Sequence, residues 1–226
     1  YNKLAVVSPY FEVINRHLYW KVIARFKKMG QHSASEACEF DFTEVLNFLK
    51  EHGVKKGSLL VVHSSYDALR GCGLSPDEII DRLLDMVGPE GTLAMPAMRK
   101  YKEEPEGEDR LRVPLEEVVC AYNTRTTPIK TGMLPFALTR RKGSCVSRFP
   151  IDTMVAIGPL AGEMMKHELE GNHLAPHGVQ SSWKFCLDYK AIVVGLGVEL
   201  THHNSILHVA EESFEWPWNE DEWYRK

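Results

Sequence analysis

The amino-acid sequence predicts an α/β fold, because short apolar runs alternate along the chain with amphipathic segments. The clearest unit joins a strand at residues 58–62, a helix over 75–87 and a second strand at 92–95. Strand, helix and strand in succession are typical of a parallel crossover connection. A further apolar run, 191–198, is bounded by polar residues and indicates another buried strand.

Capping signals predict where the helices begin. Asp41 precedes a segment whose apolar residues lie between 45 and 49, and Gly53 follows as a helix stop. Ser75 is followed by Pro76 and two acidic residues. This order predicts a helix start, because serine caps a helix, proline suits the first turn and acidic groups favour the positive helix end.

The rest of the chain continues the alternation. We expect a helix over 134–141, a strand at 154–157 and a helix over 160–169. The segment 99–117 is rich in charge and contains prolines and a glycine, so it is predicted to be an irregular excursion or a lid.

Length and composition favour one main domain. The chain has 226 residues, of which 44% are hydrophobic and 26% charged, enough for one sizeable core. We expect residues 1–40 to form an N-terminal extension with a basic amphipathic helix near 17–29, and residues 41–226 to form a single domain. That helix is compatible with a membrane surface, but packing on the domain or on a partner subunit in a homodimer is favoured.

Charge and cysteine content exclude several classes of protein. A net charge of -4 and a pI near 6.2 do not fit a nucleic-acid partner, which normally needs a concentrated basic face. The five cysteines are odd in number and form no C-x-x-C pair, as expected for reduced thiols in the cytoplasm. No stretch approaches the ~20 apolar residues of a membrane span, and no signal-peptide pattern is present.

A histidine and a carboxylate follow the apolar run at 191–198. His208 and Glu211 are three residues apart, which places both on one face of a helix near the end of a strand. A carboxylate can orient an imidazole that gains and loses a proton near neutral pH, so the pair indicates proton-transfer chemistry. A metal site that includes His202 and His203, or a purely structural hydrogen bond, is the alternative.

Polar side chains also end the strand at 58–62. His63, Ser64 and Ser65 come directly after its apolar residues. If a helix follows, its free N–H groups and these hydroxyls favour an anion such as phosphate. Simple helix capping is the alternative.

The segment 171–182 is predicted to be a loop because it contains glycine and proline. Its two histidines, His173 and His177, are both candidates for catalysis, since loop residues frequently face clefts. Exposure without a function is the alternative for either one.

Taken in order, five blocks of the sequence resemble the aminoglycoside 3-N-acetyltransferase family. They are 61–65 (VVHSS), 87–96 (VGPEGTLAMP), 122–132 (YNTRTTPIKTG), 156–158 (AIG) and 207–211 (LHVAE). Their order and spacing agree from about residue 42 to residue 212. Each block is only moderately specific, and the agreement of all five carries the resemblance.

The resemblance implies an acetyl-coenzyme A-dependent N-acetyltransferase. The implied fold is a three-layer α/β/α sandwich around a central mixed, mainly parallel sheet. Acetyl-coenzyme A would be the cosubstrate, no metal would be needed, and the acceptor would be a primary amine of an aminoglycoside or an amino sugar. The acetyl group would pass directly to the amine, with a histidine as general base.

The resemblance also implies roles for individual residues. His173 matches the histidine that takes a proton from the amine, and His208 and Glu211 match the helix that supports it. Tyr66 and Asp67 are expected to contact the substrate. The coenzyme is expected to lie at His63, Ser64, Ser65, Ser147 and Thr153.

Several positions depart from the family pattern. Val146 and Phe149 stand where many members carry arginine and histidine, which puts the coenzyme contacts around Ser147 in question. Asn123 replaces a usual aspartate and Phe136 a common glutamate. Fewer acids weaken a pocket for a polycationic antibiotic, so we expect an amino sugar rather than an acceptor linked to antibiotic resistance. Two alternatives stay open: a metal-dependent hydrolase and a catalytically inactive relative that acts as a binding protein.

Overall fold

The computed structural model describes residues 39–104, 118–170, 175–199 and 205–213. The chain divides into two compact units, of which the larger comprises 39–99 and 129–224. The predicted helix near 17–29 lies outside the described residues, so it stays a prediction, as does the domain boundary at residue 41.

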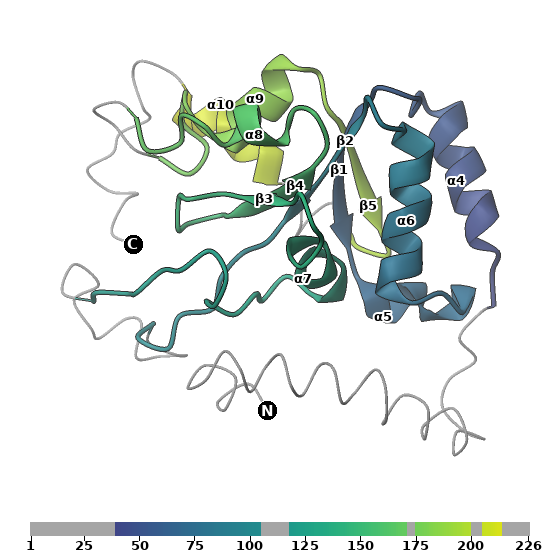
Figure 1. The fold of residues 1–226 in the computed structure, drawn as a ribbon, viewed down its shortest axis with the longest axis horizontal. Helices are drawn as coiled ribbons and strands as arrows, with labels where there is room; N and C mark the ends of the chain where they lie inside the picture. Colours follow the sequence, from purple (N-terminus) through teal and green to yellow (C-terminus); the bar gives the residue numbers. More distant parts are fainter. Residues whose placement is uncertain (1–38, 105–117, 171–174, 200–204, 214–226) are drawn as a thin grey trace. The chain divides into compact units, whose positions relative to one another are not determined.

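The larger unit contains a five-stranded mixed sheet in the order β3-β4-β2-β1-β5 (Figure 1). β1 pairs in parallel with β2 and β5, whereas β4 runs antiparallel to both β2 and β3. The α/β class and the mixed sheet are confirmed, although antiparallel pairing takes a larger share of the described sheet than we expected. The strands are β1 (Leu59–Ser64), β2 (Thr92–Pro96), β3 (Cys145–Val146), β4 (Met154–Ile157) and β5 (Ile192–Leu196).

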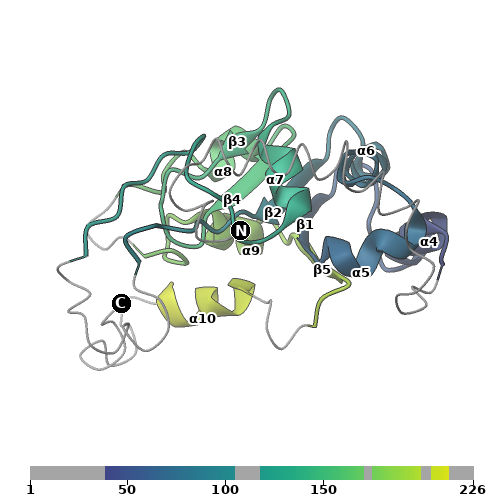
Figure 2. The ribbon, with the colours of Figure 1, turned by 90° about the horizontal axis from the view of Figure 1, so that it is seen from below.

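Helices lie on both faces of this sheet, and Figure 2 shows α6 and α7 on one side with α9 and α10 on the other. None of the helices in the described part of the chain combines the length and apolar character that a membrane crossing needs. The helices are α4 (Phe42–Glu51), α5 (Tyr66–Leu69), η2 (Arg70–Cys72), α6 (Pro76–Val87), α7 (Met133–Thr139), α8 (Ala161–Met164), α9 (Ser182–Asp188), η5 (Ser205–His208) and α10 (Val209–Glu212).

The core is built on the alternation of side chains along the strands. Leu59 and Val61 of β1 belong to an apolar cluster with Met164 of α8, Trp183 of α9 and Val209 of α10. Successive strand residues point to opposite faces, so the intervening residues of β1 face the layer that contains α6. This arrangement explains why β1 is apolar at every position up to its end.

The predicted crossover from β1 through α6 to β2 is present, and its helix begins where expected. Ser75 accepts a hydrogen bond from the Glu78 N–H at 3.3 Å, and the Glu78 carboxylate accepts one from the Ser75 N–H at 2.7 Å. This reciprocal capping box satisfies two backbone donors that the helix leaves unpaired.

Three elements differ from the sequence-based expectation. The helix predicted over 160–169 ends early, since α8 stops at Met164. Gly162 lowers its helix propensity, and further along Glu168 turns into the interior to accept a backbone N–H. β3 and α9 were not predicted; β3 has only two residues, and α9 has seven.

The described part of the smaller unit contains a turn organised by Asn123. Its side-chain oxygen accepts hydrogen bonds from the N–H groups of Arg125 at 2.9 Å and Thr126 at 3.1 Å. Asparagine commonly stabilises turns in this way. The amide that replaces the usual family aspartate therefore has a local structural task.

Segments that carry polar side chains meet at one edge of the sheet, where several strands begin or end. β1, β2 and β5 all end there because they are parallel. β4 begins at the same edge because it is antiparallel, with Met154 opposite Pro96. β3 also ends there, and the Ser147 N–H donates to the Met154 carbonyl at 2.9 Å. The segments around His63, Ser147 and Asp152 consequently meet at one edge.

Candidate active site

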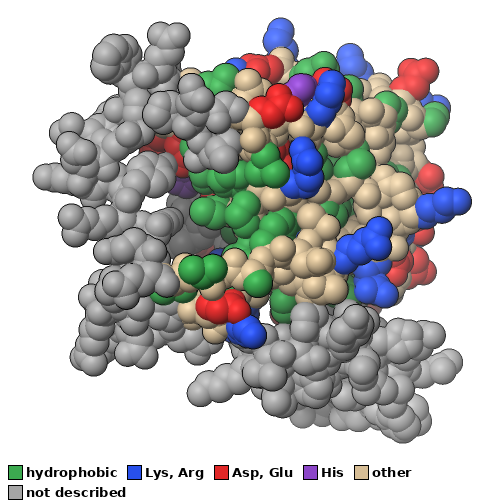
Figure 3. Space-filling view, turned by 60° about the vertical axis from the view of Figure 1, so that its left-hand side comes forward, with side chains coloured by type: hydrophobic (Ala, Val, Ile, Leu, Met, Phe, Trp, Pro, Cys, Tyr) green, Lys and Arg blue, Asp and Glu red, His purple; other side chains and the backbone are tan. Residues whose placement is uncertain are grey.

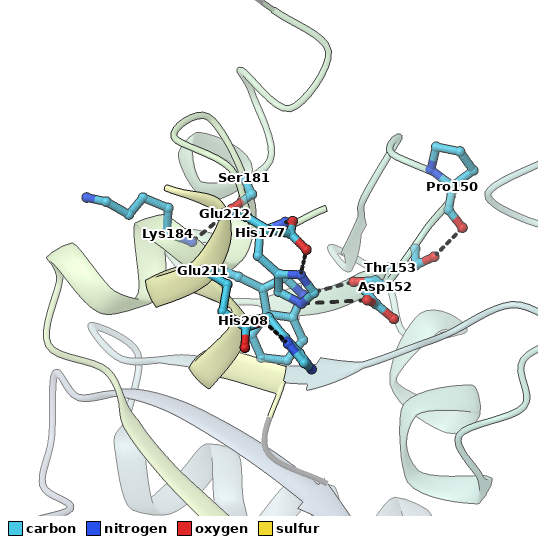
Figure 4. Close-up of polar contacts among 10 residues, drawn as sticks. Pro150, Asp152, Thr153, His177, Ser181, Lys184, His208, Glu211 and Glu212 are labelled. Carbon is cyan, nitrogen blue, oxygen red and sulfur yellow. Dashed lines mark hydrogen bonds and ion pairs between the residues drawn. The ribbon is translucent and has the colours of Figure 1, made fainter. Parts of the chain in front are cut away.

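His177 is the buried centre of the candidate active site, with a side chain only 2% exposed. Its ring lies between two carboxylates (Figure 4): Nδ1 is 3.3 Å from Glu212 Oε1, and Nε2 is 3.6 Å from Asp152 Oδ2. Glu212 Oε2 also accepts the His177 backbone N–H at 2.8 Å. The ring contacts lack hydrogen-bond geometry, and such contacts often tighten only when a substrate binds.

A row of rings supports His177 from both sides. The ring centroid of His177 lies 5.6 Å from that of Trp183 and 5.2 Å from that of His208. On its other side, Trp183 lies 6.0 Å from His63, at the end of β1. The Trp183 indole is completely buried, so it forms a fixed platform between the sheet and the candidate site.

Asp152 is held in an unusual backbone conformation. Its φ of 46° lies in the left-handed region, which non-glycine residues seldom adopt and aspartate tolerates better than most. The Trp183 indole N–H donates to the Asp152 carbonyl at 2.9 Å. The Asp152 side chain is 28% exposed, so its carboxylate faces both His177 and solvent.

The predicted pair of His208 and Glu211 is formed, with 2.7 Å between His208 Nδ1 and Glu211 Oε2. Both side chains are more than half exposed, at 55% and 60%. The inward face of α10 instead carries buried Val209 and, three positions later, Glu212. His208 thus adjoins the site, while Glu212 is the carboxylate that faces the buried imidazole.

His173, predicted as the base, lies outside the described residues, and its role stays a prediction. The predictions from sequence did not include Asp152, Trp183 or Glu212. For Glu212, the three-residue spacing from apolar Val209 was the available signal. For Asp152 and Trp183 no local signal existed, because their hydrogen bond joins positions far apart in the chain.

The predicted coenzyme segment ends β1 as expected. His63 is buried, whereas Ser64 and Ser65 are partly exposed. Ser65 precedes α5, and its side chain makes no capping hydrogen bond there. Gly197, after β5, packs so closely on this segment that an added Cβ would lie 2.5 Å from Ala68 Cβ. The partly exposed hydroxyls fit a site for an anionic group.

Ser147 and Thr153, also predicted to contact the coenzyme, are buried beneath this edge. The Ser147 hydroxyl accepts the Phe149 N–H at 3.2 Å, and the Thr153 hydroxyl donates to the Pro150 carbonyl at 3.3 Å. Their hydroxyls thus have partners within the chain. Coenzyme contacts by Ser147 and Thr153 stay predictions.

The two predicted substrate contacts differ in exposure. Tyr66 is buried, and its hydroxyl donates to the Leu74 carbonyl at 2.8 Å. Asp67 is 82% exposed and lies 2.7 Å from the Arg70 guanidinium. Their roles toward a substrate stay predictions.

Glu168 is a buried acid next to this site. Burial raises the pKa of its carboxyl group, while hydrogen bonds from the Ser147 and Ser182 hydroxyls and from two backbone N–H groups oppose that rise. The Arg148 N–H is one of these donors, at 3.0 Å. Burial is the largest of these effects, so the neutral acid is favoured relative to an exposed glutamate.

Within the described ranges, no three histidine, cysteine or acidic side chains form a cluster suited to a metal; His202 and His203 lie outside these ranges. On the face drawn in Figure 3, the described lysine and arginine side chains are interspersed with acidic ones.

Comparison with known proteins identifies the family. A family model described as aminoglycoside 3-N-acetyltransferase matches residues 61–225. Aminoglycoside N(3)-acetyltransferase IX of Micromonospora chalcea is 30% identical over 170 residues, which cover 72% of this chain and 58% of that protein. Aminoglycoside N(3)-acetyltransferase IV of Salmonella sp is 28% identical over 177 residues, covering 76% and 59%. The chain belongs to the aminoglycoside 3-N-acetyltransferase family.

Solved structures agree with this assignment. Aminoglycoside acetyltransferase AAC(3)-Xa superposes with a TM-score of 0.63 at 28% identity, covering 76% of this chain and 61% of that one. AAC-IIIb, in a binary complex with CoASH, gives 0.61 at 26% identity, covering 76% and 64%. The chain therefore spans about three fifths of the length of the relatives it matches.

The raised pKa of Glu168 predicts a pH-dependent stability. A group whose pKa is raised on folding stabilises the protein at pH values below its ordinary pKa, which is about 4.3 for glutamate. This stabilisation is lost as the pH rises through the pKa of the folded state. Glu168→Gln carries no titrating proton. We therefore expect the melting temperature of the wild type to fall relative to that of Glu168→Gln as the pH rises above about 4.3.

Glu163→Gln is the matched control, because Glu163 lies in the same stretch of chain with a side chain 54% exposed. Its melting curve should follow the wild type across this pH range. A wild-type melting temperature that instead rises relative to Glu168→Gln would contradict burial as the dominant effect on this carboxyl group.

Proposed function

We propose that this protein is an acetyl-coenzyme A-dependent N-acetyltransferase that acylates a primary amine by direct transfer, with His177 as general base. The observation that carries the proposal is the buried imidazole of His177 between the carboxylates of Asp152 and Glu212. Membership of the acetyltransferase family supports the reaction class. The geometry supports the choice of base.

The chemistry requires a group that accepts a proton. An amine nitrogen must lose protons as it attacks the thioester and becomes an amide, and an imidazole can accept one near neutral pH. The C–N bond forms, the C–S bond breaks, and the imidazolium can return its proton to the departing sulfur, so coenzyme A leaves as a thiol. Asp152 and Glu212 would stabilise the imidazolium between these steps.

The partly exposed Asp152 gives the amine a place to bind. A carboxylate that faces solvent on one side and His177 Nε2 on the other would attract an ammonium group and hold it beside the base. Glu212 contacts Nδ1 and the His177 backbone, so it would fix the orientation of the ring. His208 and Glu211 would support the same ring from the exposed side.

The coenzyme would lie along the edge of the sheet that ends β1. Ser64 and Ser65 offer partly exposed hydroxyls there, and the related AAC-IIIb has been solved with CoASH. His63 would support this segment through its ring contact with Trp183. The proposed arrangement places the thioester end of the coenzyme near His177.

The acceptor is proposed to be an amino sugar rather than a polycationic aminoglycoside. The relatives are named for aminoglycosides, and a mutant of AAC(3)-IVa has been solved in complex with apramycin. In this chain, Phe136 replaces a common glutamate, and the Arg140 guanidinium lies 5.7 Å from its ring centroid. A cation of the chain itself at this position disfavours a second cation from a substrate.

The proposed base predicts a specific loss of activity. His177→Gln removes the proton acceptor but preserves much of the side-chain volume, so we expect kcat for acetyl transfer to fall by about 100-fold to 10,000-fold. Coenzyme A binding, measured by calorimetry, should persist. Steady-state release of free thiol from acetyl-coenzyme A in the presence of an amine provides the rate.

His173→Gln is the matched comparison, because His173 lies four residues before His177 in the sequence. We expect it to transfer acetyl groups faster than His177→Gln. A His173→Gln protein that binds coenzyme A without transfer, beside an active His177→Gln, would assign the base to His173 instead. Failure of the wild type to bind coenzyme A would favour an inactive relative that acts as a binding protein.

The predicted acceptor can be tested with a panel of amines. Monocationic amino sugars should show higher kcat/KM than aminoglycosides of several positive charges, because Phe136 stands where a glutamate is common and the Arg140 guanidinium lies over its ring. Phe136→Glu should shift this preference toward aminoglycosides. Aminoglycosides that react far faster than amino sugars with the wild type would refute the proposed acceptor.

A further inference from the structure

Glu168 has no part in the proposed proton transfer, yet its residue is only 5% exposed. It follows the short helix α8 and points into the interior. The Arg148 N–H donates to its carboxylate at 3.0 Å, and the Phe149 N–H and the hydroxyls of Ser147 and Ser182 lie close enough to lower its pKa. A single side chain thus lies against polar groups of two separate segments.

The guanidinium of Arg148 does not pair with the Glu168 carboxylate. Arg148 gives Glu168 its backbone N–H, while its side chain donates to the Lys166 carbonyl at 3.2 Å. A buried carboxylate is costly unless fixed donors replace its water. The carboxylate of Glu168 therefore depends on the arrangement of the two segments, and their arrangement depends on it.

Each of the two segments continues along the chain to a residue that contacts the candidate base, His177. The first, residues 147–149, continues to Asp152, whose carboxylate faces His177 Nε2. The second begins α9 at Ser182 and continues to Trp183, which packs on the His177 ring and binds the Asp152 carbonyl. Glu168 and Asp152 also line the same narrow hollow.

We infer that Glu168 is a positioning residue that fastens the loop bearing Asp152 to the start of α9 and so holds the Asp152 carboxylate beside His177. Trp183 makes the second fastening, through its hydrogen bond to the Asp152 carbonyl. The attachments at Arg148 and at the Asp152 carbonyl together restrict the left-handed conformation of Asp152. The expected effect of Glu168 on the transfer rate rests on the proposed function, but its effect on the placement of Asp152 does not.

The test compares two neutral replacements in the full chain. Glu168→Gln keeps an oxygen that can accept the Arg148 N–H, whereas Glu168→Ala removes this acceptor. Both remove the charge, so a difference between them reports on geometry. Histidine ring nitrogens are labelled with ¹⁵N, and the His177 resonances are assigned by their loss in His177→Gln. Glu163→Gln is the control at an exposed acid of the same stretch.

We expect Glu168→Ala to displace the His177 Nε2 resonance, while Glu168→Gln and Glu163→Gln keep it near the wild-type position. In the transfer assay, Glu168→Ala should lower kcat by up to about 100-fold, as misplacement by about 1 Å can do. Glu168→Gln should recover most of that loss. If Glu168→Ala does not fold, Glu168→Asp, which is too short to reach both segments, should displace the same resonance.

A folded Glu168→Ala or Glu168→Asp protein whose His177 resonances match those of Glu168→Gln would overturn the inference. The two proposals fail separately. A wild type without transferase activity would refute the proposed function, while the resonance comparison would still decide whether Glu168 positions Asp152.

Discussion

The burial of one imidazole between two carboxylates is the constraint on which the candidate site depends. His177 is removed from solvent, and its ring nitrogens face Asp152 and Glu212. A buried imidazolium is costly without such partners, and a buried carboxylate such as Glu212 is costly without a donor. Glu212 meets this need twice, because it faces the ring and accepts the backbone N–H of the same residue. The loop, α10 and the turn at Asp152 are therefore mutually dependent.

The mixed sheet makes this meeting of distant segments possible. β4 runs antiparallel to β2, so the residues just before it lie at the edge where the parallel strands end. A parallel β4 would begin at the opposite edge, and Asp152 would lie a full strand length away. The antiparallel pairings, which are more frequent than the sequence suggested, are thus what bring Asp152 to His177. Trp183 contacts both residues, through its hydrogen bond to the Asp152 carbonyl and its ring contact with His177.

Local signals in the sequence predicted the elements that depend on local physics. β1, α6 and β2 follow from apolar runs and from the capping box at Ser75. Beyond the early end of α8, Glu168 turns inward and accepts the N–H of Arg148, which lies 20 residues earlier in the chain. Two-residue β3 exists only through pairing with β4. β3 has no local pattern that could predict it, and Gly162 is the local sign of the early end of α8.

The candidate site shows the same division. The spacing of His208 and Glu211 correctly predicted that the two side chains meet. It did not show which carboxylate faces inward, since that depends on Val209 packing against the core. The buried base candidate, His177, was one of two histidines that the loop offered, and only tertiary contacts distinguish it. Family resemblance supplied the reaction class, which local chemistry alone left open.

The most direct test of the central interaction is the rate of acetyl transfer by Asp152→Asn, Glu212→Gln and the double variant. If both carboxylates act through the one imidazole, each single replacement should lower kcat by about 100-fold, and the double variant should lose much less than the product of the two. Folded single variants that retain the wild-type kcat would contradict the role of His177 and its two carboxylates.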